Sequence, residues 1–275
     1  MNPPTIFQII CLALVLSMYS VFESKTEAVT VQKLTSEGQD GETGAFTDPR
    51  DGQTYQWVRI GDQVWMAENL RYLPAVTGPG SGSSTTPYYY VYDYNGMDIN
   101  AAKATANYQH YGVLYNWAAV MDGASSSSAN PSGVQGVCPP GWHVPSDAEW
   151  SQLVDYVVSK GYPNADVVHG AGNALKSCRQ VDSPLMGACN TSEHPRWNPH
   201  HTYYGTDEFG FSALPGGYRN ARGSFRILGI GSRWWSSTES SSTFIWARLM
   251  GYGGGIGPGG YDRSCGFSIR CVRDN

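Results

Sequence analysis

Charge of either sign is sparse in this 275-residue sequence. Asp, Glu, Lys and Arg together make up 15% of the residues, and the 18 basic residues form no cluster. With a formal net charge of -5, the chain lacks the electrostatic attraction on which nonspecific nucleic-acid binding depends. We therefore expect no nucleic-acid partner. No internal repeat of useful length occurs either.

The patterns of well-known catalytic and metal sites are also missing. The sequence has no G-x-S-x-G motif between a strand and a helix, so a serine hydrolase is not expected. The histidines and cysteines between Gly170 and Asp207 lack the ligand spacing of structural zinc motifs. The sequence thus predicts no cofactor, no metal site and no catalytic residue. A binding protein is expected more than an enzyme.

Glycine and aromatic residues, by contrast, are abundant. The sequence has 33 glycines, and aromatic residues make up 13% of it. This combination is typical of turn-rich β structure rather than of helical bundles. A chain of this length buries enough surface to fold without depending on cross-links.

The N-terminal segment has the features of an export signal. An apolar run over residues 6–22 is followed by a polar stretch, and Thr26 and Ala28 offer an approximate cleavage site. We expect a signal peptide over residues 1–28, a polar linker over residues 29–46, and a secreted or cell-surface location. The alternative is an uncleaved membrane anchor, and the protein would associate with a membrane only in that case.

Five cysteines follow the predicted cleavage site, and exported proteins commonly form disulfides. Cys178 and Cys189 bracket a short loop with proline and glycine, so this pair is easily closed. Cys138 has two possible partners near the C-terminus, Cys271 and Cys265. The cysteine left over would stay buried and inert or pair between molecules.

Local patterns predict a hairpin and two helices. Residues 55–60 and 63–67 alternate on either side of a two-residue turn at Gly61 and Asp62, which is typical of a β-hairpin. The spacing of Tyr and Leu residues over 107–121 predicts one short amphipathic helix.

The second helix has the clearest signal in the chain. Ser146 and Glu149 form a capping box, an apolar face follows, and Gly161 ends the helix. Asp147 and Glu149 resemble a catalytic carboxylate pair in spacing. We favour capping and interaction with the helix dipole as their role.

Short strands separated by glycine turns are predicted from Phe209 onward. One of them contains Trp234 and Trp235, and adjacent side chains of a strand point to opposite faces. The two indoles should therefore not lie in the same core layer, and one of them should face away from it. It would be covered by the glycine-rich loop after Met250, or would form an aromatic ledge with Trp246 or with the tyrosines of residues 88–94.

Five residues near these strands are the candidate ligand-binding residues. They are Trp235, Trp246, Arg219, Arg233 and Glu239. Such a ledge with a few polar groups suits stacking against sugar rings or a protein partner. The alternative is that the charged side chains form salt bridges beneath loops.

Several motifs in a fixed order give a family resemblance. "DGQTYQWVRIGDQVWMAENL", "YGVLYNW", "GVCPPGWHVPSDAEW", "GTDEFGFSALPGGYR", "WWSSTE" and "GFSIRCVRD" together resemble the Fibrobacter succinogenes major paralogous domain. The resemblance covers residues 47–275 and implies an exported bacterial module. It also favours Cys138 with Cys271 as a disulfide, beside Cys178 with Cys189.

A more distant similarity, carried by "HVPSDAEW" and "GFSIRCV", links the chain to the formylglycine-generating and sulfatase-modifying group. It implies an α+β, C-type-lectin-like fold with twisted antiparallel sheets, two short helices and long irregular loops. The cysteine pair of those enzymes is missing from the region that reads "SRWWSSTES". The sugar-binding motifs of calcium-dependent lectins are missing as well.

Two hypotheses about function follow. The first is a noncatalytic surface or secreted module that binds a polysaccharide or a cell-surface protein through aromatic and arginine side chains. The second is a cysteine-dependent oxidoreductase or modifying enzyme that relies on Cys265 and Cys271. A thiol titration of the native protein separates the two hypotheses.

Overall fold

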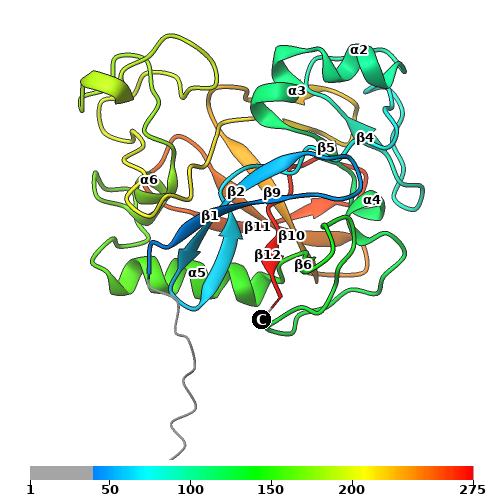
Figure 1. The fold of residues 1–275 in the computed structure, drawn as a ribbon, viewed down its shortest axis with the longest axis horizontal. Coiled ribbons are helices and arrows are strands. Elements are labelled where there is room, and N and C mark those ends of the chain that lie inside the picture. The colour runs from blue at the N-terminus through cyan, green and yellow to red at the C-terminus, as the bar shows by residue number, and fades with distance from the viewer. Residues whose placement is uncertain (1–39, 275) are drawn as a thin grey trace, which may run out of the picture. The chain divides into compact units, whose positions relative to one another are not determined.

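The computed structural model describes residues 40–274 (Figure 1). The predicted signal peptide over residues 1–28 and most of the predicted linker over residues 29–46 lie outside the described residues. Within residues 40–274, no helix combines the length and the apolar composition that crossing a membrane requires.

The first strand begins inside the predicted linker. β1 (Thr43–Thr47) pairs antiparallel with β2 (Thr54–Ile60) along its whole length. Phe46 of β1 stacks on Trp142, with ring centroids 4.4 Å apart. The folded domain therefore extends into residues 43–46. The ladder with β2 holds this segment, which has no apolar pattern that would have signalled a strand.

Five strands form the first antiparallel sheet. In spatial order they are β1, β2, β3 (Gln63–Met66), β12 (Val272–Arg273) and β6 (Trp142–His143). The predicted hairpin is confirmed in β2 and β3, and Gly61 adopts a φ of +59° in its turn. The last strand of the chain thus lies in the middle of the sheet, between β3 and β6.

Three strands form the second antiparallel sheet, in the order β11–β10–β9. They are β9 (Ser232–Glu239), β10 (Phe244–Met250) and β11 (Gly257–Asp262). The first two were predicted as strands. β11 lies in the glycine-rich segment after Met250, and its residues pair with β10 along their length. Ladder hydrogen bonds need only the backbone, so a six-residue segment with three glycines can complete a sheet.

Two further sheets contain two strands each. They are β4 (Tyr89–Tyr90) with β5 (Leu114–Tyr115), and β7 (Tyr218–Arg219) with β8 (Phe225–Arg226). All four sheets are antiparallel within the described residues, as predicted.

The single helix predicted over residues 107–121 is wrong. α3 (Ala106–Tyr111) ends at Gly112, β5 follows, and a second helix, α4 (Trp117–Met121), begins after it. Gly112 has a φ of +77°, and a Cβ at this position would lie 2.7 Å from a backbone oxygen. The apolar residues have helical spacing, but the backbone turns left-handed between them.

Five α-helices occur among residues 40–274, rather than the two predicted. Besides α3 and α4 they are α2 (Ile99–Lys103), α5 (Asp147–Ser159) and α6 (Ala171–Leu175), and a short 3-10 helix covers Gly187–Cys189. The architecture is nevertheless mixed α+β, with antiparallel sheets and mostly short helices.

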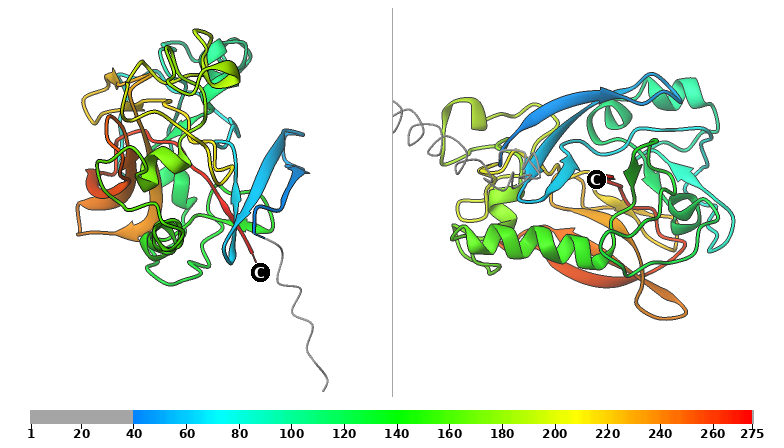
Figure 2. Two further views of the ribbon diagram at one scale, coloured as in Figure 1. Left: turned by 90° about the vertical axis from the view of Figure 1, so that its left-hand side faces the viewer. Right: turned by 60° about the horizontal axis from the view of Figure 1, so that its bottom comes forward.

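The capping box of α5 is confirmed. Ser146 Oγ accepts a hydrogen bond from the Glu149 amide at 3.1 Å, and Glu149 Oε2 accepts one from the Ser146 amide at 2.9 Å. The helix runs alongside the second sheet (Figure 2), where Arg248 of β10 pairs with Asp147 at 2.8 Å. α5 is thereby fixed to the face of the sheet that it covers.

β9 lies between two hydrophobic cores. Trp235 belongs to the core beneath α4 and stacks on Phe267, with ring centroids 4.3 Å apart. Trp234 belongs to the core beneath α5 and lies 6.3 Å from the ring of Trp150. The prediction that the two indoles point to opposite faces is confirmed, and both are 0% exposed.

The structure contains two disulfides. Cys138 is bonded to Cys271 across 133 residues, with Cα atoms 6.0 Å apart. Cys178 is bonded to Cys189, with Cα atoms 4.7 Å apart. Both predicted pairs are therefore present, and the first joins the middle of the chain to its last strand.

Candidate functional site

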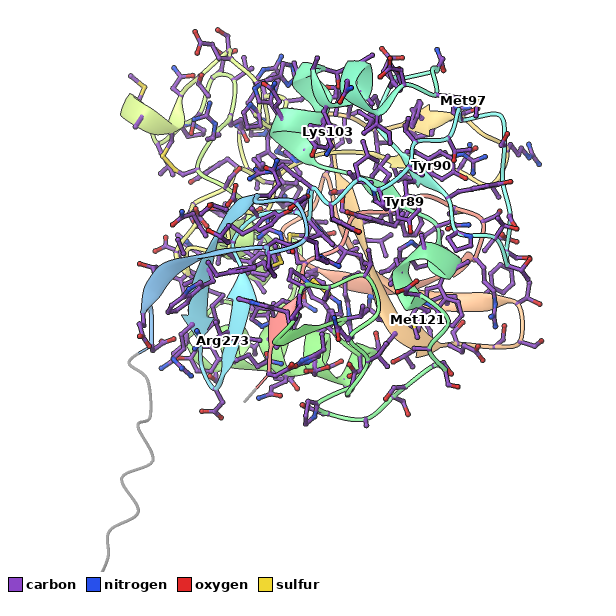
Figure 3. The ribbon with its side chains drawn as sticks, turned by 45° about the vertical axis from the view of Figure 1, so that its right-hand side comes forward. Tyr89, Tyr90, Met97, Lys103, Met121 and Arg273 are labelled. Atoms are coloured by element: carbon purple, nitrogen blue, oxygen red, sulfur yellow. A yellow bond between two sulfur atoms is a disulfide. The ribbon has the colours of Figure 1, made fainter. Side chains whose placement is uncertain are left out.

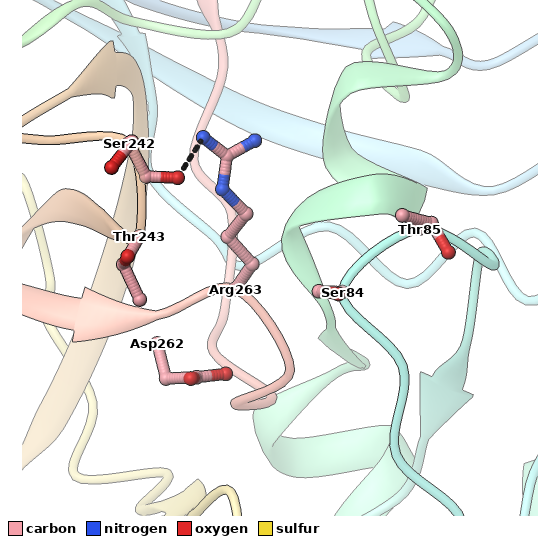
Figure 4. A pocket seen from close by; sticks show the side chains of 6 residues that line it. All are labelled: Ser84, Thr85, Ser242, Thr243, Asp262 and Arg263. Carbon is pink, nitrogen blue, oxygen red and sulfur yellow. Dashed lines mark hydrogen bonds between the residues drawn. The ribbon is translucent and has the colours of Figure 1, made fainter.

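A polar pocket of about 370 Å³ lies where three separate segments meet (Figure 4). The segments are the loop before β4, the turn between β9 and β10, and the end of β11. Their lining residues are Ser84, Thr85, Ser242, Thr243, Asp262 and Arg263. Four of these side chains carry hydroxyl groups, so the pocket offers both donors and acceptors of hydrogen bonds.

Arg263 is held at one side of the pocket by three contacts. Its Nη2 donates to Glu239 Oε1 at 2.9 Å and to the Ser242 carbonyl at 3.1 Å, the bond drawn in Figure 4. Its guanidinium lies 4.7 Å above the ring centroid of Trp117. Nη2 makes both hydrogen bonds. Nε and Nη1 have no acceptor among residues 40–274 and remain available to a ligand.

Asp262 supplies the carboxylate of the pocket. Its Oδ1 accepts hydrogen bonds from the Ser264 amide at 2.8 Å and the Ser264 hydroxyl at 2.6 Å. These bonds orient the carboxylate, while Oδ2 has no donor among the described residues. Asp262 can therefore accept a hydrogen bond from a ligand hydroxyl without losing a contact of its own.

The loop that carries Ser84 and Thr85 is fixed from below. The side-chain Nδ2 of Asn116 donates to the carbonyls of Ser83 and Thr86 at 2.8 Å each. Ser83 Oγ in turn accepts bonds from the Thr85 and Thr86 amides. Specific hydrogen bonds therefore hold this wall of the pocket in place.

Arg219, predicted to bind ligand, instead anchors the same loop. It is 1% exposed and donates to the carbonyls of Pro79, Ser81 and Ser264 at 2.8 to 2.9 Å. Burying a guanidinium is tolerated only when its donors are satisfied, and backbone oxygens satisfy them here. The side chain positions the pocket and does not reach it.

The tyrosines of residues 88–94 are partly or fully buried. Tyr89 and Tyr90 lie next to one another on β4 (Figure 3), and Tyr90 is 0% exposed. The guanidinium of Arg219 lies 4.5 Å from the ring centroid of Tyr90. These two tyrosines support the loop rather than form the outer ledge that the sequence suggested.

Phe244 and Trp246 form an aromatic edge beside the pocket. Phe244 is 46% exposed and lies directly opposite Asp262 in the β10–β11 ladder, so both side chains emerge on one face. Trp246, two residues along β10, is half-buried and lies opposite Gly260. Because glycine has no side chain, β11 leaves this part of the indole uncovered.

Trp235 does not belong to this edge, which corrects its assignment as a ligand-binding residue. Its ring is fully buried, and its Nε1 donates to the Tyr115 carbonyl at 2.8 Å. Phe267 and the core beneath α4 cover the ring where the sequence suggested an open surface. Sequence alternation placed the ring on the correct face but could not show that a second core covers that face.

The two remaining candidates have different surroundings. Glu239 is exposed and forms the ion pair with Arg263, so it lies next to the pocket and orients one of its donors. Arg233 is partly exposed and stacks on Tyr218 and Tyr261 away from the pocket-lining residues. Of the five predicted residues, Glu239 and Trp246 therefore lie at or beside the pocket.

The cysteine pair of the alternative hypothesis is not formed. Cys271 is bonded to Cys138, while Cys265 is a free thiol with 5% exposure. Burial, with a further contribution from Asp262, raises the pKa of Cys265 to about 11. A thiol in this environment is a poor nucleophile, because the thiolate is the reactive form.

A buried histidine between two carboxylates resembles a catalytic relay. His143 Nε2 is 2.6 Å from Glu149 Oε1, and its Nδ1 is 2.7 Å from Asp274 Oδ1. Burial lowers the pKa of His143, but the bonds with Glu149 and Asp274 outweigh it and raise the pKa overall. Glu149 Oε2 accepts from the Ser132 and Ser146 amides, so every member is bonded internally. The group fastens the C-terminus to α5.

Sequence reasoning missed all six pocket-lining residues. A signal was available in the run of hydroxyl residues over 240–243, between two strands that were both predicted. A hairpin turn rich in Ser and Thr exposes many hydroxyls at one place. The approach of residues 84–85 and 262–263 to this turn depends on long-range packing and had no local signal.

Comparison with known proteins gives a single result. The family model described as the Fibrobacter succinogenes major domain matches residues 58–273. No curated protein and no solved structure matches the chain. The matched range contains all six residues that line the pocket.

Proposed function

Since the chain belongs to the Fibrobacter succinogenes major domain family, we propose that it is an exported, noncatalytic module of that family that binds carbohydrate. Its ligand would occupy the pocket of Ser242, Asp262 and Arg263 and would stack against Phe244. Two disulfides support export, because they persist in oxidising compartments. The α+β architecture and the distant sequence similarity support a C-type-lectin-like fold as part of this proposal.

The combination of the hydroxyl-lined pocket with an exposed aromatic ring carries the proposal. A sugar presents hydroxyl groups at its edge and apolar C–H groups on its face. Asp262 Oδ2 offers an acceptor, Arg263 offers free donors, and the hydroxyls of Ser and Thr residues serve as either. Phe244, opposite Asp262, supplies an apolar surface for the sugar face.

The same residues favour binding over hydrolysis. Glycoside hydrolysis generally uses two carboxyl groups that flank the scissile bond. Asp262 is the one carboxylate among the residues that line the pocket, and Glu239 nearby is held by Arg263. The proposal therefore assigns recognition to the pocket and no reaction.

Retention on immobilised polysaccharides tests this proposal. The purified full-length protein would be passed over cellulose, xylan, mannan and chitin, and then compared with Asp262→Asn and Thr243→Ala variants. We expect both variants to bind at least about 5-fold more weakly, since each loses one hydrogen bond to the ligand. Asp155→Asn on the exposed face of α5 is a matched control and should bind normally.

Two outcomes would contradict the proposal. One is no retention of the wild-type protein on any of these four neutral polysaccharides or on an acidic one such as polygalacturonate. The other is retention that Asp262→Asn and Thr243→Ala leave unchanged, which would place the binding surface elsewhere. Circular dichroism spectra of the variants would establish that they are folded.

A further inference from the structure

Arg233 of β9 is held between aromatic rings at a partly exposed position. Its guanidinium carbon lies 3.6 Å from the ring centroid of Tyr218 and 4.5 Å from that of Tyr261. The buried ring of Phe267 lies beneath, at 5.7 Å. Two phenol rings and one phenyl ring thus fix the guanidinium in one place.

The donors of this group have no partner among residues 40–274. No side-chain nitrogen of Arg233 donates a hydrogen bond or forms an ion pair there, and its Nε is buried. The hydroxyl groups of Tyr218 and Tyr261 make no hydrogen bond with the described residues either. Four other arginines differ, since acceptors bind the guanidinium groups of Arg219, Arg248, Arg263 and Arg270.

Stacking explains why the donors are free. Aromatic rings contact the flat faces of a guanidinium, whereas its five N–H groups point outward in its plane. The Nε of Arg233 is buried, so the edge that this stacked arginine keeps for another group is the outer one, formed by Nη1 and Nη2. That edge matches the two oxygens of a carboxylate or a sulfate, which accept two parallel hydrogen bonds.

Local charge favours an anion at this position. Arg226 lies opposite Tyr218 in the β7–β8 ladder but is exposed, so water and salt screen its charge. Asp262, the residue after Tyr261, projects from the opposite face of β11 and is bonded to Ser264. No salt bridge of the described residues neutralises Arg233.

We propose that Arg233, Tyr218 and Tyr261 form a second binding site, on the face of β11 opposite Asp262, for an anionic group, namely a carboxylate or a sulfate ester carried by a saccharide. This inference deepens the proposed function and rests on it, because the proposed function is what makes the ligand a saccharide. It makes acidic polysaccharides, with uronic acids or sulfated sugars, the preferred class of ligand.

Calorimetric titration with three oligosaccharides tests the site in the full-length protein. The probes are oligogalacturonate, which carries carboxylates, dextran sulfate of similar length, and neutral dextran. We expect one of the acidic probes to bind at least about 10-fold more tightly than neutral dextran, as a charge-assisted bidentate contact implies. Comparison of the two acidic probes identifies the anionic group.

Variants locate the effect. Arg233→Gln should remove the preference for the acidic probe, and Arg233→Lys, which keeps the charge but not the planar fork, should retain only part of it. Arg226→Gln removes the same charge from an exposed neighbour and should change affinity by less than about 2-fold. Thermal unfolding of each variant without ligand, compared with the wild type, shows whether Arg233→Gln and Arg233→Lys are folded.

The outcomes separate this inference from the proposed function. Equal binding of acidic and neutral probes, or equal losses in Arg233→Gln and Arg226→Gln, overturns the anion site. Polysaccharide retention that depends on Asp262 would still support the pocket in that case. Absence of binding to every acidic probe at millimolar concentration also overturns the inference.

Discussion

Trp234 and Trp235 are neighbours in β9, yet their indoles pack into two different hydrophobic cores. Trp234 Nε1 donates to Asn69 Oδ1 at 2.9 Å, and Trp235 Nε1 donates to the Tyr115 carbonyl at 2.8 Å. The second sheet is therefore buried on both of its faces at this strand. Its exposed chemistry lies at the hairpin turn and along β11.

Replacing either indole by phenylalanine should destabilise the protein independently of the other. Trp234→Phe and Trp235→Phe each lose one buried hydrogen bond and some volume, so we expect each to lower the free energy of unfolding by about 1–3 kcal/mol. Because the rings occupy separate cores, the double variant should lose the sum to within about 0.5 kcal/mol. Urea denaturation of the four proteins measures this. A coupling above about 1 kcal/mol would show that the two cores are not independent.

The two disulfides should contribute unequally to stability. In the chain-entropy treatment, a cross-link that spans 133 residues contributes about 5 kcal/mol, whereas one that spans 11 contributes about 3 kcal/mol. We expect the Cys138→Ala, Cys271→Ala double variant to unfold at lower temperature than the Cys178→Ala, Cys189→Ala variant. Calorimetry under non-reducing conditions compares them, and the reverse order would contradict the prediction.

Cys265 should be unreactive in the native protein. Its thiol is buried, and its pKa is raised to about 11 by burial. We expect the wild type and Cys265→Ser to react with a thiol reagent to the same extent when folded. After denaturation without reductant, the wild type should show one more thiol. Rapid labelling of Cys265 in the folded protein would revive the cysteine-dependent enzyme as a candidate.

The contacts of His143 should make stability depend on pH. The pKa of His143 is raised in the folded protein above its ordinary value of 6.5, because the bonds with Glu149 and Asp274 outweigh burial. A raised pKa stabilises the fold where histidine is protonated in both states, below pH 6.5. This contribution is lost as the pH rises from 6.5 through the higher folded pKa.

Chemical denaturation across that pH range measures the effect. We expect the free energy of unfolding of the wild type to fall as the pH rises through this window. His143→Gln has no titrating group at this position, so its stability should vary less over the same range. Identical pH profiles for the two proteins would contradict the role given to His143.

Local patterns were sufficient for several elements of the fold. The hairpin of β2 and β3 follows from alternation around Gly61, and α5 follows from the capping box of Ser146 and Glu149. In both cases the signal and the structure lie within about 20 residues of chain, so neighbouring residues decide the conformation. The short-loop disulfide of Cys178 and Cys189 belongs to the same group.

Long-range contacts decided where sequence predictions were wrong. Residues 107–121 have a helical pattern, but Gly112 approaches the backbone of Leu70 and breaks the helix. Three of the six residues of β11 are glycines, so no alternating pattern signals this strand, and pairing with β10 holds it. Arg219 has the charge and the hydrogen-bond donors of a ligand-binding residue. The carbonyls that bind it, however, come from loops distant in sequence.

By itself, the sequence determined the local elements, the α+β class, the family and the alternation that separates Trp234 from Trp235, because each depends on residue order or on backbone periodicity. Only the tertiary structure decided which of the aromatic and charged side chains remain accessible. It buried Trp235 and Arg219, left Phe244 and Arg233 accessible, and joined residues 84–85, 242–243 and 262–263 into one pocket. Accessibility depends on what packs above a residue, and that neighbour is supplied by a remote part of the chain.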